Sequence, residues 1–240
     1  MHALARQVEA RTERLAAASV EGLYADPFWF ARYGEERARR FGGEDAVFHV
    51  RYLVQALDAE DAGILERYAK WLQGLLVPRG MCSLHIDAHF AGLHAALVHE
   101  GLAQPPLALD YVRAARTALL WPEGPAHAVH EALPALVAHG VRALSPPEAP
   151  SSPADARLGL EDELRLQLSY LMDAMGAQRP ALFLTHVRWY AGFWPRRGLG
   201  CGYRELLECL EVALIEHLSD WKVPRVTVAM GLTELQKEHS

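Results

Sequence analysis

Two histidines spaced four residues apart have the residue type and spacing to share one ligand. The segment MCSLHIDAHFAGLHAALVHE at 81–100 carries His85, His89, His94 and His99 on one predicted helix. Residues at i and i+4 of a helix lie on the same face. His85 and His89 are therefore candidate ligands for one transition-metal ion, or could flank a planar cofactor such as haem or another tetrapyrrole. A solvated helix face is the alternative interpretation of the same spacing.

Motifs of well-characterised catalytic sites are missing from the sequence. It has no Glu-x-x-His pair of a di-iron bundle, no GxGxxG, no P-loop and no GxSxG. His130-Glu131 lacks the second histidine that a zincin requires. These absences favour a non-catalytic protein over an enzyme.

The elements that must position the histidines are predicted to be helices. Gly and Pro separate segments rich in Ala, Leu, Arg and Glu, and alternating β-branched runs are scarce. We expect helices at about 3–18, 26–40, 44–58, 61–76, 82–100, 105–119, 125–143, 159–175, 180–194, 202–220 and 227–237. VPRVTVAM at 223–230 is the one strand candidate. The predicted fold class is an all-α helical bundle without a significant sheet.

An ungapped internal repeat relates the two halves of the chain. With an offset of 118 residues, the segment 52–80 aligns with the segment 170–198. The identical pairs include Tyr52 with Tyr170, Trp71 with Trp189, and Arg79-Gly80 with Arg197-Gly198. We interpret the match as a tandem duplication of a multi-helix unit, with the first repeat at about 44–100 and the second at about 162–218. Each Arg-Gly pair predicts a turn in which the glycine adopts positive φ, and globin-like packing is expected for the bundle.

A segment rich in Pro and Ser, at 144–158, is the predicted linker between the two halves. Clustered prolines prevent a helix from continuing and favour extended backbone. The expected organisation is an N-terminal helical unit at 1–143 and a C-terminal helical unit at 159–240.

The repeat strengthens the hypothesis that the histidines line a pocket. His85 and His89 align with Tyr203 and Leu207 on the apolar face of the second copy. Gly92 and Ala96 of the same stripe align with Leu210 and Leu214, which predicts vacant space beside the histidines. A separate apolar row on the first-copy helix, at Ile86, Phe90, Leu93 and Leu97, leaves two alternatives. Either the helix is covered on several sides, or the histidine stripe faces solvent.

Aromatic residues supply the other candidate contacts. Tyr52, Trp71, Tyr170 and Trp189, which both copies share, complete the predicted ligand-binding set with His85 and His89. A second aromatic group begins a predicted helix after Asp26 and comprises Tyr24, Phe28, Trp29, Phe30 and Tyr33. Aromatic rows at helical spacing are usually core, with a cofactor cage as the alternative.

Composition limits the class of protein. Hydrophobic residues make up 51% and charged residues 22%, as in globular proteins, and the formal net charge is −6. That charge makes nucleic acid an unlikely partner, and the sequence lacks the long apolar run of a membrane span. Three cysteines without metal-site spacing fit a reducing, cytoplasmic location.

Two functions remain as hypotheses. The favoured one is a non-catalytic regulatory or sensory protein that binds a small molecule, a tetrapyrrole or a partner protein in a pocket or interface between the repeats, with another protein or a second copy of the chain as the candidate protein partners. The alternative is a haem- or metal-dependent redox protein that uses His85 and His89.

Overall fold

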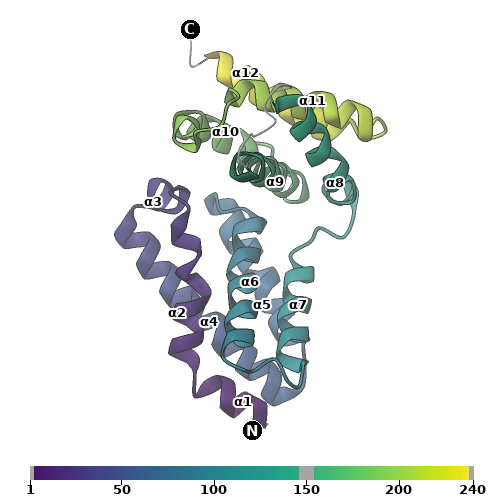
Figure 1. Ribbon diagram of the computed structural model, residues 1–240. Coiled ribbons are helices and arrows are strands. Elements are labelled where there is room, and N and C mark those ends of the chain that lie inside the picture. The colour runs from purple at the N-terminus through teal and green to yellow at the C-terminus, as the bar shows by residue number, and fades with distance from the viewer. Residues whose placement is uncertain (1–2, 146–153, 238–240) are drawn as a thin grey trace. The chain divides into compact units, whose positions relative to one another are not determined.

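A computed structural model describes residues 3–145 and 154–237 of the chain. These residues form helices joined by turns and loops, and none of them lies in a strand (Figure 1). The all-α prediction is thereby confirmed. The strand candidate at 223–230 is wrong, because it lies within helix α12 (Lys222–Lys237). Burial of Pro224, Thr227, Val228 and Gly231 follows helical rather than strand periodicity.

The chain divides into two compact units, 1–120 and 121–240. The sequence analysis instead placed the boundary within 144–158. The difference arises because helix α8 (Gly124–Leu144) packs against helices of the second unit. Of the expected linker, residues 146–153 lie outside the described residues. The end of α8 at Leu144 does not coincide with the limit of a compact unit.

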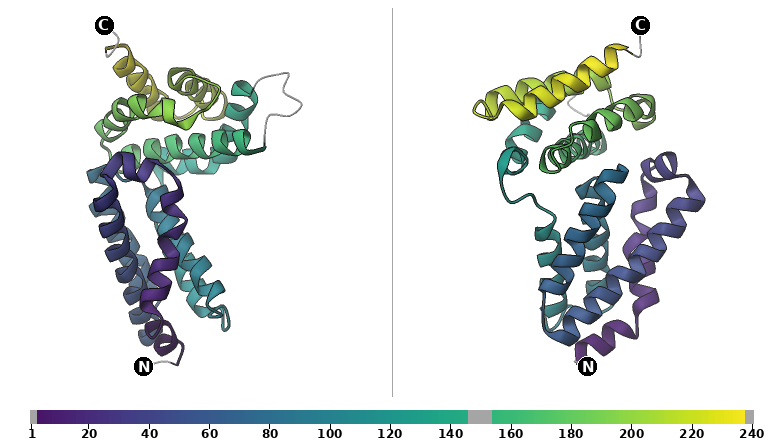
Figure 2. Two further views of the ribbon diagram at one scale, coloured as in Figure 1. Left: turned by 60° about the vertical axis from the view of Figure 1, so that its left-hand side comes forward. Right: turned by 180° about the vertical axis from the view of Figure 1, so that it is seen from behind.

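The first unit consists of helices packed around one apolar core. Its elements are α1 (Ala3–Glu9), α2 (Thr12–Glu21), η1 (Leu23–Ala25), α3 (Phe28–Tyr33), α4 (Glu35–Ala59), α5 (Gly63–Leu76), η2 (Val77–Arg79), α6 (Ser83–His99) and α7 (Leu107–Ala118). Helix α4 has 25 residues and is packed along α1, α2 and α5 (Figure 2). The expected break between helices near 40–44 is absent, since α4 continues through Gly42 and Gly43.

The second unit has its own set of helices. Its elements are α8, α9 (Ala154–Gly176), α10 (Ala181–Phe193), η3 (Trp194–Arg197), α11 (Tyr203–His217) and α12. Helix α9 packs against α8, α10 and α12, and α11 packs against α8 and α12. No helix in the described parts of the chain is both long enough and apolar enough to cross a bilayer.

Element bounds in the two units follow the offset of 118 residues. Adding it to the bounds of α4, α5 and α6 gives the bounds of α9, α10 and α11 to within two residues at each end. The turns correspond as well. Gly80 and Gly198 both have positive φ, of 91° and 64°, as the Arg-Gly turns predict. Glu60 and Gln178 are likewise both left-handed, with φ of 53° and 54°.

Candidate ligand-binding site

Helix α6 is covered on several sides, which decides between the two alternatives for the histidine stripe. His85 and His89 are 8% and 6% exposed, and the neighbouring apolar row of Ile86, Phe90 and Leu93 is buried too. Helices α2, α4, α5 and α7 all pack against α6. The two histidines are therefore core residues of the first unit.

The vacant space predicted beside Gly92 is not present. A Cβ atom on Gly92 would come within 2.0 Å of the backbone carbonyl oxygen of Ser19. Helix α2 occupies this place with its backbone and crosses α6 closely at the glycine. The small residue on α6 thus permits close helix packing and leaves no pocket there.

A cavity of about 260 Å³ lies elsewhere in the first unit, between α3, α4, η2 and α6. Its aromatic walls are Tyr24, Trp29 and Tyr33; its polar lining is Arg37, Asp45, Arg79 and His89; and Ala38, Gly42, Leu76 and Met81 complete it. The two arginines are exposed, so the cavity reaches solvent beside them. A mainly apolar cavity with a few converging polar groups is the usual form of a small-molecule site.

His89 is an uncharged polar group in this lining. Burial lowers its pKa to about 4, so the imidazole is neutral at pH 7. Its ring packs edge-on against Trp29 at 5.7 Å and His49 at 5.5 Å between centroids. Its Nδ1 atom is buried without a hydrogen-bond partner among the described residues. Leaving such a buried atom unsatisfied costs about 1–3 kcal/mol.

Asp45 is the acidic group of the cavity. Burial and, as a smaller cause, the nearby Glu44 carboxylate raise its pKa to about 6. Neither Asp45 nor Arg79 takes part in an ion pair between described residues, although both line the same cavity. Arg79 donates a hydrogen bond to the backbone carbonyl of Leu75. The site thus holds a half-buried carboxylate and a guanidinium that do not neutralise each other directly.

The aromatic wall depends on two local features of the sequence. The backbone N–H of Phe28 donates to the Asp26 carboxylate at 2.8 Å, which fixes the start of α3 and with it Trp29. On the other side, Tyr24 donates to the carbonyl of Ala38 at 3.2 Å. A Cβ atom on Gly42 would lie 2.2 Å from the Tyr24 hydroxyl. Glycine at 42 therefore lets Tyr24 lie directly on α4.

Of the six residues predicted to bind a ligand, His89 alone lines this cavity among the described residues. His85 packs between Phe28 and Trp29, with ring centroids 4.6 and 4.9 Å away. It therefore supports the Trp29 wall from behind.

The four predicted aromatic residues lie in stacks within their own units. Tyr52 stacks on Tyr68 at 3.8 Å, and Trp71 is 58% exposed beside the same ring. In the second unit, Tyr170 stacks on His186 at 3.5 Å. Trp189 stacks on Phe193 at 5.2 Å. These contacts give the aromatic residues a packing role within each unit.

The predicted metal ligands find no third partner. In the described part of the chain, one group of His, Cys, Asp or Glu side chains has three ligand atoms close together, and it comprises His139, Glu216 and His217. His139 Nδ1 lies 3.2 Å from Glu216 Oε2, at the ends of α8 and α11. No sequence pattern indicated this group, because His139 is distant along the chain from the adjacent pair Glu216 and His217.

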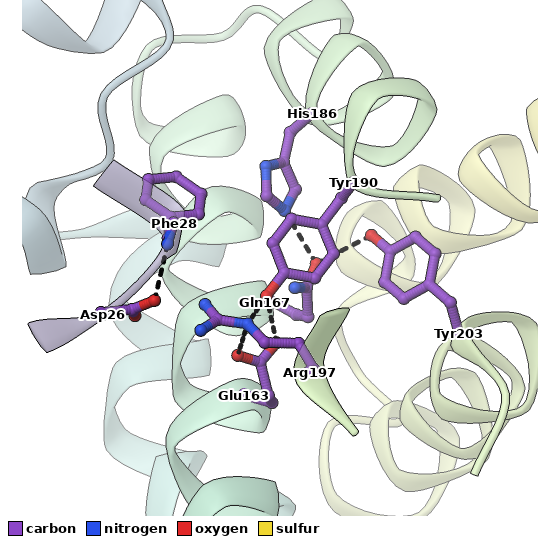
Figure 3. A network of polar contacts seen from close by, with 8 residues as sticks. All are labelled: Asp26, Phe28, Glu163, Gln167, His186, Tyr190, Arg197 and Tyr203. Atoms are coloured by element: carbon purple, nitrogen blue, oxygen red, sulfur yellow. Dashed lines mark hydrogen bonds and ion pairs between the residues drawn. The ribbon is translucent and has the colours of Figure 1, made fainter. Parts of the chain in front are cut away.

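A buried polar network lies in the second unit, and sequence reasoning missed its centre (Figure 3). The Nε atom of Arg197 lies 2.7 Å from a Glu163 carboxylate oxygen. The Tyr190 hydroxyl donates to the other Glu163 oxygen and accepts from Arg197 Nε at 2.8 Å. Burial and the Glu163 carboxylate raise the pKa of Tyr190, so its hydroxyl stays protonated and donates.

Gln167 extends this network. Its Oε1 atom accepts from the Tyr203 hydroxyl at 2.9 Å and lies 2.9 Å from His186 Nε2 (Figure 3). The first unit has a comparable contact, since His49 Nδ1 lies 2.9 Å from the Tyr68 hydroxyl. The offset of 118 residues places His49 at Gln167 and Tyr68 at His186. The same pair of positions is hydrogen-bonded in both units with different residue types.

Comparison with known proteins adds no identification. No family model, no curated protein and no solved structure matches this chain. The function must therefore be argued from the geometry of the chain itself.

Proposed function

We propose that this chain is a non-catalytic regulatory or sensory protein that binds a small molecule in the cavity of its first unit. The observation that carries the proposal is the composition of that cavity. It combines an aromatic wall, an unpartnered buried imidazole at His89, and the charged groups of Asp45 and Arg79. Buried polar groups without partners are costly, and a ligand that hydrogen-bonds to them removes that cost.

We further propose that the two units are tandem copies of one ancestral unit. The shared offset of helix bounds supports this, as do the left-handed residues Glu60 and Gln178. Paired contacts support it independently of helix length. Tyr52 stacks on position 68 and Tyr170 on position 186, both within 4 Å between centroids. Globin-like packing of the bundle stays a prediction.

Differences between the copies account for the cavity. Two residues of its lining are smaller than their counterparts in the second unit: Gly42 corresponds to Leu160, and Leu76 corresponds to Trp194. Leu72, a buried core residue outside this lining, corresponds to Tyr190. Leu160, Tyr190 and Trp194 are all buried in the second unit. The first copy is thus proposed to be the binding copy, and the second to be a filled, structural one.

The size of the cavity selects among the candidate ligands. About 260 Å³ lies just below the ~300–1,000 Å³ typical of ligand pockets, so it suits a molecule with a single ring. A tetrapyrrole, with four rings in one plane, does not suit it. The alternative of a haem- or metal-dependent redox protein is less well supported, because His85 lies outside the cavity lining.

For ligand binding in the first unit to have a regulatory effect, the chain must contact another molecule. We propose that this molecule is a protein partner or a second copy of the chain. The second unit exposes large apolar side chains on α11, α12 and the turn between them, comprising Val212, Ile215, Trp221, Val223, Val226 and Met230. Exposed apolar groups of this kind are typical of interaction surfaces.

Saturation-transfer NMR with single-ring compounds tests the proposal. Toluene, p-cresol, benzoate and benzylamine would be added separately to the wild-type chain and to Leu76→Trp, which gives the first copy the larger residue of the second. We expect at least one compound to bind the wild type and to lose binding in Leu76→Trp. Leu120→Trp, the same change at an exposed position, is the matched control and retains binding. Binding of no compound, or equal binding to Leu76→Trp, would overturn the proposal.

A further inference from the structure

The second unit shows how this fold holds a phenol between an acid and an arginine. Glu163 and Arg197 form an ion pair whose side chains are 6% and 13% exposed. The Tyr190 hydroxyl contacts both, donating to the carboxylate and accepting from the guanidinium. One hydroxyl group thus satisfies a charged acceptor and a charged donor at the same time.

The first unit has the acid and the arginine without a phenol at the position of Tyr190. Asp45 and Arg79 stand at the positions of Glu163 and Arg197, and both line the cavity. Leu72 stands where the second unit has Tyr190, so no side chain supplies the hydroxyl from that position. Asp45 is also one methylene shorter than Glu163.

We propose that the ligand of the cavity is a single-ring phenol whose hydroxyl bridges Asp45 and Arg79, as the Tyr190 hydroxyl bridges Glu163 and Arg197. This inference rests on the proposed function of the cavity and on the correspondence between the units. The ring of the ligand would lie against the aromatic wall of Tyr24 and Trp29.

Other ligand chemistries satisfy the site less well. A carboxylate would be repelled by the ionised Asp45, and an amine would be repelled by Arg79 and the neighbouring Arg37. An apolar ring would leave the carboxylate and the guanidinium without a shared partner. An aliphatic alcohol would satisfy the charges but would not offer an aromatic face to Trp29.

Titration calorimetry with p-cresol, the side-chain analogue of tyrosine, tests the inference in the full chain. We expect p-cresol to bind the wild type about tenfold or more tighter than toluene, p-toluate or 4-methylcyclohexanol, because a hydrogen bond to a charged group is worth at least that factor. Asp45→Asn and Arg79→Met should each reduce the preference of p-cresol over toluene to less than about threefold.

Two substitutions at Leu72 compare a side chain that carries a hydroxyl with one that does not. A purely structural effect would not distinguish their melting temperatures. Leu72→Tyr supplies the hydroxyl from the chain itself, so p-cresol binding should be lost while the melting temperature rises. Leu72→Phe fills the same volume without a hydroxyl, so binding should be lost without that rise. Equal melting temperatures for the two variants would count against the bridge.

The outcomes separate this inference from the proposed function. If toluene and p-cresol bind equally, and both lose binding in Leu76→Trp, the cavity binds small molecules but the hydroxyl bridge is wrong. If 4-methylcyclohexanol matches p-cresol, the bridge stands and the aromatic specificity is wrong. If no compound binds, the proposed function fails first.

Discussion

The Arg197 guanidinium contacts the Glu163 carboxylate, with 2.7 Å between Nε and the nearer oxygen, and both side chains are buried. At the corresponding positions of the first unit, Arg79 and Asp45 border a cavity instead. The same two charge types thus form an internal ion pair in one unit and line a cavity in the other.

The buried pair should be sensitive to the loss of one partner. Arg197→Met leaves the Glu163 carboxylate uncompensated in the core, and we expect a loss of about 3–5 kcal/mol in the free energy of unfolding. Urea denaturation measures it. The exposed pair Arg204–Glu208, four residues apart on α11, provides the control. Arg204→Met should cost less than about 0.5 kcal/mol, and a comparable loss in both variants would contradict the assignment.

Acid should destabilise the first unit through His89. Its folded pKa of about 4 lies below the ordinary value of 6.5, so the unfolded chain binds the proton more tightly. The stability it contributes is complete above about pH 6.5 and is lost as the pH falls towards 4, on the order of 3 kcal/mol in total.

Substitution of His89 by leucine, the residue of the second copy, provides the test of this pH dependence. His89→Leu should reduce the slope of stability between pH 6.5 and 4 without abolishing it. The slope persists in part because burial also lowers the pKa of His49, which packs against His89. Unfolding free energies at four or five pH values would show the change, and an unaltered slope would be the contrary result.

Asp45 should have the opposite effect on the pH profile. Its raised pKa means that the folded state binds a proton more tightly than the unfolded chain. Stability contributed by Asp45 is therefore present below about pH 4 and is lost as the pH rises through 6. Asp45→Asn should raise the melting temperature at pH 7 and have little effect at pH 4, as differential scanning calorimetry would show. A lower melting temperature of Asp45→Asn at pH 7 would contradict this prediction.

Gly92 should tolerate no side chain. A methyl group there meets the backbone of α2 at Ser19, which cannot move as a flexible side chain can. Gly92→Ala is expected to cost about 1–3 kcal/mol, the usual effect of overpacking. Gly74 on α5 has open space at its Cβ position, so Gly74→Ala should stabilise the protein by about 0.5–1 kcal/mol. Thermal or urea unfolding would measure the stability of both variants. A loss in Gly92→Ala together with a gain in Gly74→Ala would separate the packing clash from the effect of helix propensity.

Transition-metal ions should bind to the second unit rather than to the first. We expect Ni²⁺ or Zn²⁺ binding, measured by titration calorimetry, to be weakened at least about tenfold by His139→Ala, which removes one of three ligands. The His85→Ala/His89→Ala double variant should bind the metal as the wild type does. Weaker metal binding by the His85→Ala/His89→Ala double variant, together with unchanged binding by His139→Ala, would instead place the metal site in the first unit.

The helical fold could be predicted from the sequence, because it depends on local signals. The Arg-Gly turns at Gly80 and Gly198 follow from backbone conformation, and their positive φ is confirmed. The unit boundary could not be predicted in this way. The prolines after Leu144 indicate where α8 ends, whereas the unit to which α8 belongs depends on its packing with α9 and α11.

The candidate site was predicted only in part. His89 lines the cavity, but the space was expected at Gly92, where α2 in fact crosses. The lining residues that are smaller than their counterparts at the offset of 118 are Gly42 and Leu76, on α4 and α5. Comparing the copies at every position of the offset would have found them. Only the three-dimensional packing shows which small residues border a cavity and which ones let another helix approach closely.

Gly42 sets the position of the Tyr24 ring, since any side chain at 42 would meet the Tyr24 hydroxyl. A side chain at 42 would therefore change the space beside Tyr24, whereas the charges of the lining come from other positions, Asp45 and Arg79 among them. The dimensions of the cavity and its charge are thus set by different residues.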